Sequence, residues 1–136
     1  ESGRDAMRPA LDRLAEDPDL ERGLATLAET LLRGVLSPEV VEMRRLVINE
    51  AKTQPDVAAL YLRESWQRNI DALASTLDTL RSTRNLRIDD ARLAAEEFTW
   101  LLVGAPLNES LLGVAPPTEA NRSGHAIAAF LARYAH

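Results

Sequence analysis

The sequence contains no cysteine, which removes two classes of structure at once. Without thiols the chain can form neither a disulfide framework nor a thiolate metal site, and this suits a reducing cytoplasm. Only two histidines are present, His125 and His136, and neither belongs to a Glu-x-x-His or His-Glu-x-x-His pair of the kind that binds metals on helices. We therefore predict a cytoplasmic protein with no metal site and no cofactor.

Signatures of catalysis are missing as well. The sequence holds no Gly-x-Ser-x-Gly turn, no glycine-rich phosphate loop and no cysteine nucleophile. Glu96 and Glu97 are adjacent, so their side chains diverge around a helix, which predicts two partly solvated carboxylates rather than a catalytic pair. No catalytic residue is predicted, and an enzyme is not expected.

Lysine is nearly absent, and positive charge of any kind is dispersed. Lys52 and fifteen arginines are mixed with 21 acidic residues, and the net charge is −5. Duplex DNA is bound largely through clustered lysine and arginine, so this chain is not expected to bind DNA by itself. Its longest apolar run, residues 100–107, is far too short to cross a bilayer, and no signal peptide is present, so no membrane partner is predicted.

The sequence is rich in signals that begin helices. Asp, Ser or Thr followed by proline or an acidic residue is typical of a capped first turn. Runs of alternating apolar and polar residues are missing, so we predict an all-α fold with one core, a single domain over residues 1–136. The predicted starts are Asp17-Pro18-Asp19, Ser37-Pro38-Glu39, Gln54-Pro55-Asp56, Asp89-Asp90 and, after two prolines, Thr118-Glu119.

Apolar spacing predicts helices over about residues 8–16, 20–35, 37–53, 55–84, 89–112 and 118–135. The helix that begins at Pro55 changes phase near residues 63–65, because Tyr61 and Trp66 fall on nearly opposite faces of a regular helix. Either the helix kinks there and Ser65 caps its second part, or its two halves pack against different neighbours. Asn85 is expected to end this helix in the left-handed conformation.

The helix that begins at Pro38 carries an arginine, Arg44, inside an apolar arc that covers more than half of its circumference. Two interpretations are open. Arg44, like Glu50 at the edge of the arc, can pair with another group inside the fold while its stem lies on apolar surface. Alternatively, these residues face a cavity and orient a bound molecule.

The last two helices are predicted to form an interface with a second copy of the chain. The helix over 89–112 is apolar on two sides and so needs two partners, and the last helix is rich in small residues that allow close approach. Alternatively, the alanines only favour helix formation. The predicted interface residues are Leu107, Leu111, Gly124, Ile127 and Leu131.

Five segments together resemble a known family: residues 38–51, 55–58, 86–90, 94–98 and 102–107. In order and spacing they resemble the C-terminal regulatory domain of TetR-family transcriptional regulators, especially the AefR-like group, from about Leu20 to the end. One departure is Asn85, where the group often has glycine, although both residues tolerate a left-handed turn.

The resemblance implies an antiparallel helical domain that forms a homodimer through its last two helices and encloses a cavity for a small-molecule effector. It also implies an N-terminal helix-turn-helix that binds operator DNA. No such motif is visible in this chain, which begins at Glu1 and not at methionine, so we expect the DNA-binding part to be missing.

These observations predict the effector-sensing and dimerisation domain of a transcriptional regulator, most simply a repressor. The alternative is a small all-α enzyme or a structural protein-interaction module. If the helix from Pro38 faces a cavity, apolar walls imply a mainly hydrophobic effector, and Arg44 implies an acidic or hydrogen-bond-accepting group on it. The predicted ligand-binding residues are Met43, Arg44, Val47, Tyr61, Trp66, Phe98 and Trp100.

Overall fold

The computed structural model describes residues 3–114 and 122–135, and in this part of the chain all regular structure is helical. The all-α prediction is confirmed. The predicted beginning of the last helix at Thr118 lies outside the described residues. The elements are α1 (Gly3–Glu16), α2 (Leu20–Val35), α3 (Pro38–Glu50), α4 (Pro55–Tyr61), the π-helical segment η1 (Leu62–Gln67), α5 (Arg68–Thr83), α6 (Ala91–Leu111) and α7 (Arg122–Tyr134).

Three of these helices have a side chain that caps the N-terminus. Asp19 accepts a hydrogen bond from the amide of Arg22, Ser37 accepts one from Val40, and Asp90 accepts one from Leu93. Each bond satisfies an amide that has no partner within its own helix. The helix starts predicted at these positions are therefore confirmed, and α4 begins at Pro55 as predicted.

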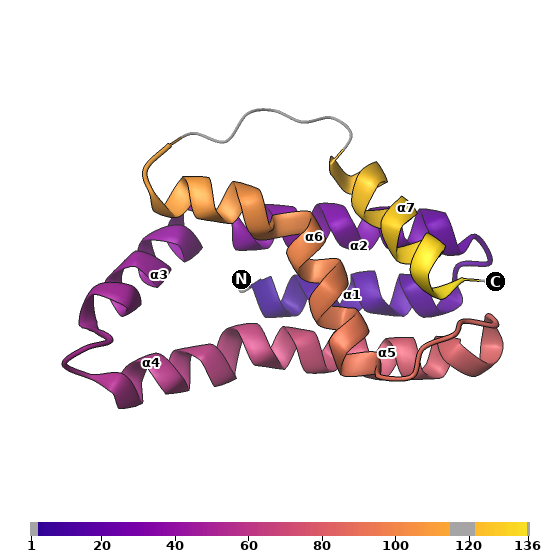
Figure 1. Ribbon diagram of the computed structural model, residues 1–136, viewed down its shortest axis with the longest axis horizontal. Helices are drawn as coiled ribbons and strands as arrows, with labels where there is room; N and C mark the ends of the chain where they lie inside the picture. Colours follow the sequence, from indigo (N-terminus) through magenta and orange to yellow (C-terminus); the bar gives the residue numbers. More distant parts are fainter. Residues whose placement is uncertain (1–2, 115–121, 136) are drawn as a thin grey trace.

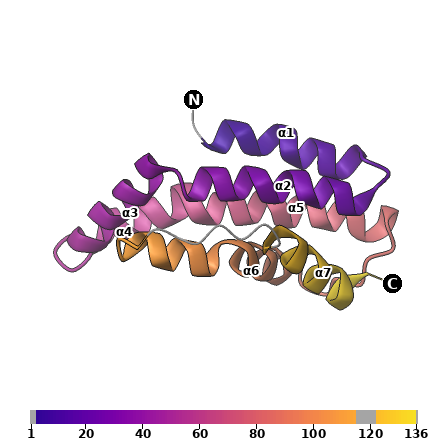
Figure 2. The ribbon, with the colours of Figure 1, turned by 90° about the horizontal axis from the view of Figure 1, so that it is seen from above.

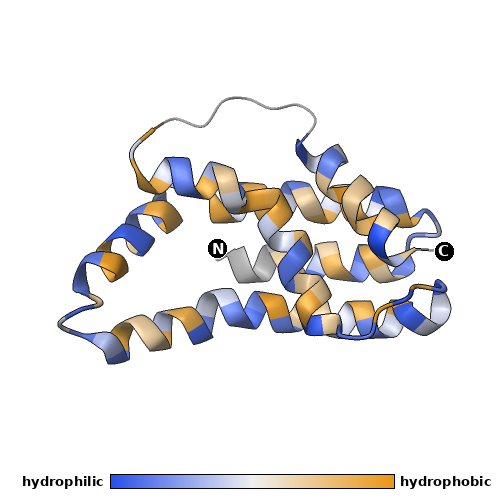
Figure 3. Cartoon of the chain, in the orientation of Figure 1, coloured by the Kyte–Doolittle hydropathy of each residue, from blue (hydrophilic) through white to orange (hydrophobic). Residues whose placement is uncertain are grey.

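The helices pack in layers (Figures 1 and 2). Helix α1 lies on α2 and α5, while α6 and α7 cover the other side of the same pair. Helices α3 and α4 form a bent extension at one end, at the left of Figure 1. In Figure 3 hydrophobic and hydrophilic residues are mixed along every helix, as expected where each turns one apolar side inward.

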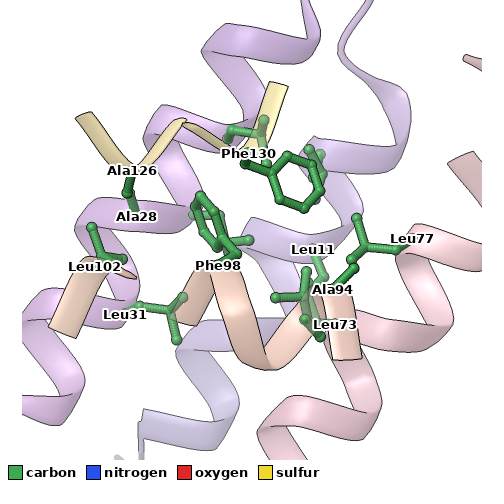
Figure 4. Close-up of a cluster of buried hydrophobic side chains, with 14 of the residues drawn as sticks. Leu11, Ala28, Leu31, Leu73, Leu77, Ala94, Phe98, Leu102, Ala126 and Phe130 are labelled. Atoms are coloured by element: carbon green, nitrogen blue, oxygen red, sulfur yellow. The ribbon is translucent and has the colours of Figure 1, made fainter. Parts of the chain in front are cut away.

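The core is formed by leucines from α1, α2 and α5 against the middle of α6 (Figure 4). Leu14, Leu27 and Leu80 have no exposed surface. Phe98 of α6 packs edge-on against Phe130 of α7, with ring centroids 5.5 Å apart, and so joins the last helix to the core. The extension of α3 and α4 contributes little, because Val41 is its one buried residue.

The change of phase predicted after Pro55 is confirmed, and its cause is a π turn over Leu62–Gln67. Ser65 does not cap a new helix, because its hydroxyl donates instead to the carbonyl oxygen of Tyr61 at 2.6 Å. In a regular α-helix, side chains five residues apart are separated by about 140°. A π turn contains one additional residue per turn, so Tyr61 and Trp66 come onto nearly the same side.

Asp17 links the turn before α2 to neighbouring segments. Its carboxylate accepts hydrogen bonds from Nε and Nη2 of Arg22, at 2.9 and 2.8 Å, and from the amide of Asp19 at 2.8 Å. Its carbonyl oxygen accepts one from the guanidinium of Arg84. The bonds from Arg22 and Asp19 lower the pKa of Asp17 from 3.8 to about 2.

We expect Asp17→Asn to lower the melting temperature at pH 6. A carboxyl group whose pKa is lower in the folded state stabilises the fold above its unfolded pKa, and this contribution disappears as the pH falls through the folded value. The difference between wild type and variant should therefore shrink between pH 4 and pH 2. Circular dichroism melts across this range measure it, with Asp12→Asn, at an exposed acid on α1, as control. A difference that stays constant would contradict this role.

Candidate ligand-binding site

A cavity of about 340 Å³ lies where the extension of α3 and α4 meets the main body. This volume lies within the range of small-molecule sites. Its walls come from α1, α2, α3, α4, η1 and α5, and they combine apolar residues with a few polar ones. The lining residues are Met7, Thr30, Leu31, Gly34, Val35, Glu39, Val40, Met43, Arg44, Tyr61, Glu64, Ser65, Trp66 and Asn69.

Arg44 is placed on this cavity by α3 and lies against two aromatic rings. Its guanidinium carbon is 5.2 Å from the ring centroid of Trp66 and 5.8 Å from that of Tyr61. Both distances fall within the range of cation–π attraction. Nε of Arg44 is buried and has no hydrogen-bond partner among the described residues. Of the two interpretations of Arg44, internal ion pairing is not observed in the described part of the chain, and the side chain lies in a cavity wall.

Trp66 connects the cavity to α6. Its ring centroid lies 4.9 Å from that of Trp100, with an angle of 46° between the planes. Trp100 is itself 49% exposed and lies outside the cavity lining. The aromatic contacts therefore run from Tyr61 through the guanidinium of Arg44 to Trp66 and then to Trp100.

The next residue, Arg45, holds α3 against the end of α6. Its guanidinium donates to the carbonyl oxygens of Leu111 at 3.2 Å and Ser110 at 2.5 Å, and to Glu42 of its own helix at 2.9 Å. The positive charge of Arg45 is also attracted to the negative, C-terminal end of the α6 dipole. The cavity wall that carries Arg44 is thus fixed to α6 by the residue that follows it.

The structure brings together four of the predicted ligand-binding residues, Met43, Arg44, Tyr61 and Trp66, around one cavity. Val47, Phe98 and Trp100 do not line it. Phe98 is only 1% exposed and belongs to the core, because the buried side of α6 contacts α5 rather than the cavity.

Sequence reasoning did not identify the walls formed by α1 and α2. Met7, Leu31 and Val35 have the spacing of ordinary core residues, so periodicity alone assigns them to the core. One signal was available in Gly34, a glycine within an apolar helix. A Cβ atom at Gly34 would meet no atom within 4 Å, so this position borders open space.

Outside the cavity, Tyr134 is the described titratable group with the largest upward pKa shift. Burial, followed by the hydrogen bond that its hydroxyl donates to Glu97, raises the pKa of Tyr134 to about 12. Glu97 is exposed, as predicted, and Tyr134 anchors the end of α7. Among residues 3–114 and 122–135, no cluster of possible metal ligands is found, and no helix there is long and apolar enough to span a membrane.

Comparison with known families settles the class of the domain. Residues 22–136 match the model of the AefR-like transcriptional repressor C-terminal domain. The chain belongs to this family. Among curated protein sequences, none matches it significantly.

Two solved structures have the same fold as this AefR-like domain. One is a crystal structure of a protein assigned to the TetR family of transcriptional regulators, from Mesorhizobium loti MAFF303099. Its TM-score is 0.87 at 26% identity, and the match covers 97% of this chain and 67% of that one. The other is the flavonoid-responsive regulator FrrA, with a TM-score of 0.75 at 24% identity, covering 96% and 71%. The family and both similar proteins are transcriptional regulators, not enzymes.

The predicted interface residues of the AefR-like domain are only partly at its surface. Leu107 and Ile127 are buried inside the chain, because they lie on the sides of α6 and α7 that face the core. Leu111 and Leu131 are partly buried, and Gly124 is exposed. The most exposed apolar side chains of these two helices are instead Leu93, Trp100, Leu101 and Ala105 on α6 and Ala128, Ala129 and Ala132 on α7.

Proposed function

We propose that this domain binds a small, mainly hydrophobic effector in the cavity between α3 and η1. In this proposal it dimerises through α6 and α7, and the bound effector controls operator binding by a helix-turn-helix elsewhere in the regulator, which acts as a repressor. The observation that carries the proposal is the cavity itself, with its largely apolar walls and an arginine that has no acidic partner among the described residues. The family description, which names a repressor, supports it.

Dimerisation is supported by exposed apolar surface on two adjacent helices. Trp100 and Leu101 of α6 are 49% and 48% exposed, and α7, which packs on α6, exposes Ala128, Ala129 and Ala132. The same surface on two copies can pair symmetrically, as most homodimers do. The chain has a net charge of −5, which disfavours contact with DNA phosphates. We therefore assign DNA binding to another part of the regulator.

Binding can be tested with 1-naphthol, a neutral aromatic probe. The chain has two tryptophans, Trp66 and Trp100, which lie at and beside the cavity, so a bound probe should quench their emission in a saturable way. Gly34→Leu should abolish the saturable phase, because the new side chain fills open space. The variant should remain folded, since glycine within a helix is unfavourable by roughly 1 kcal/mol relative to alanine.

The matched control is Ala15→Leu, which adds the same side chain to an exposed position of α1. It should bind the probe as the wild type does. If the wild type showed no saturable quenching, or if Gly34→Leu bound equally well, the cavity would not be the effector site.

A further inference from the structure

The aromatic faces in the cavity are already occupied by a cation of the chain itself. Rings such as those of Tyr61 and Trp66 attract ligand ammonium groups when their faces are free. Here the guanidinium of Arg44 lies 5.8 and 5.2 Å from the two ring centroids. A cationic ligand would have to displace Arg44 and overcome its charge. The cavity is therefore arranged to reject cations near this point.

The π turn is what makes this arrangement possible. If the same residues were wound as a regular α-helix, Tyr61 and Trp66 would lie about 140° apart around it, and Arg44 could contact only one of them. Two rings restrict the guanidinium plane more closely than one. Its direction is thus fixed before any ligand arrives, and fixed donors lose less entropy on binding.

The charge of Arg44 is not neutralised by the acids around it. Glu39 and Glu64 also line the cavity, but neither forms an ion pair or hydrogen bond with Arg44 in the described structure. Both acids are exposed, so water screens them, whereas Nε of Arg44 is buried without a partner. A guanidinium presents a planar fork of donors that matches a carboxylate in geometry.

We propose that the cavity recognises an amphipathic organic anion whose carboxylate binds Arg44 and whose apolar body packs on Met7, Leu31 and Val35. This inference rests on the proposed function and specifies its ligand class. At the volume that a water molecule occupies in the liquid, the cavity holds about eleven non-hydrogen atoms. An aliphatic or simple aryl carboxylate of that size can place its carboxylate at Arg44 and its hydrocarbon body against the apolar wall.

The test uses three ligands that share one hydrocarbon chain: octanoate, octanamide and octylammonium. Isothermal titration calorimetry on the 136-residue chain measures their dissociation constants. We expect octanoate to bind about 10- to 150-fold more tightly than octanamide, the range of a hydrogen bond to a charged group, and octylammonium to bind most weakly. 3-Phenylpropanoate, compared with octanoate, shows whether an aryl body is preferred to an alkyl one.

Arg44→Gln should remove the preference for octanoate over octanamide, while binding of octanamide changes little. Arg63→Gln removes the same charge from an exposed position of η1 outside the cavity lining and should retain the preference. The ranking in the wild type tests the proposal even if Arg44→Gln fails to fold.

Equal affinities for the three ligands, or tightest binding of octylammonium, would overturn the assignment of the anion while leaving the cavity as an effector site. Failure of every carboxylate to bind would overturn it as well. The proposed function fails separately, if 1-naphthol also gives no saturable signal.

Discussion

Replacing Phe98 with alanine should lower the free energy of unfolding by about 3 to 5 kcal/mol. The side chain is 1% exposed and packs edge-on against Phe130, so its removal leaves a cavity and also breaks an aromatic pair. A domain of this size is stabilised by about 5 to 15 kcal/mol in total, so the loss is large. Urea denaturation followed by circular dichroism measures it.

Leu60→Ala is the matched control, because Leu60 lies on α4 and is 49% exposed. It should cost less than about 1 kcal/mol. The comparison also separates two roles for Phe98. If Phe98→Ala kept its stability but lost affinity for 1-naphthol, Phe98 would be the ligand-binding residue that the sequence predicted and not a core residue.

Replacing Ala128 with arginine should convert the proposed dimer into a monomer. Ala128 lies near the centre of the exposed side of α7, and α6 and α7 lie on one face of the molecule (Figure 2). In a symmetric interface each substitution occurs twice, so two unpaired charges would be buried together. Light scattering should report a mass that falls from twice 15.0 kDa to 15.0 kDa.

Two further variants make this test specific. Ala59→Arg places the same side chain on the exposed side of α4 and should leave the dimer intact. Gly124→Arg, at the edge of the exposed side of α7, should weaken the dimer without disturbing the chain, because a Cβ there meets no atom within 4 Å. A dimeric Ala128→Arg protein would place the interface elsewhere.

Local chemistry explains why much of the fold could be predicted from the sequence. Asp19, Ser37 and Asp90 begin helices through hydrogen bonds that span three residues, so neighbouring residues contain the whole signal. The left-handed conformation of Asn85, with φ of 60°, is equally local. The change of phase after Tyr61 was visible for the same reason, although the pattern alone could not distinguish a kink from a π turn.

Which sides of α6 and α7 are buried depends on contacts between helices, and no local sequence pattern contains this information. Helix α6 is apolar on two sides, so periodicity could not decide whether Phe98 or Leu101 points to the core. On α7, Ile127 is buried because α7 packs on both α2 and α6, and the choice of its buried side depends on where those helices lie. The α2 wall of the cavity was missed for the same reason, since Leu31 looks like any core leucine.

The π turn also has a consequence for how sites of this type can diversify. Between Tyr61 and Trp66 the chain carries one residue more than a regular helix needs to cover the same distance. A relative without the turn would show a one-residue gap at this point of an alignment, and its counterparts of Tyr61 and Trp66 would be four residues apart, about 40° around a regular helix. The π turn thus accommodates a residue inserted between the two rings, while both rings stay on the side of the helix that faces Arg44.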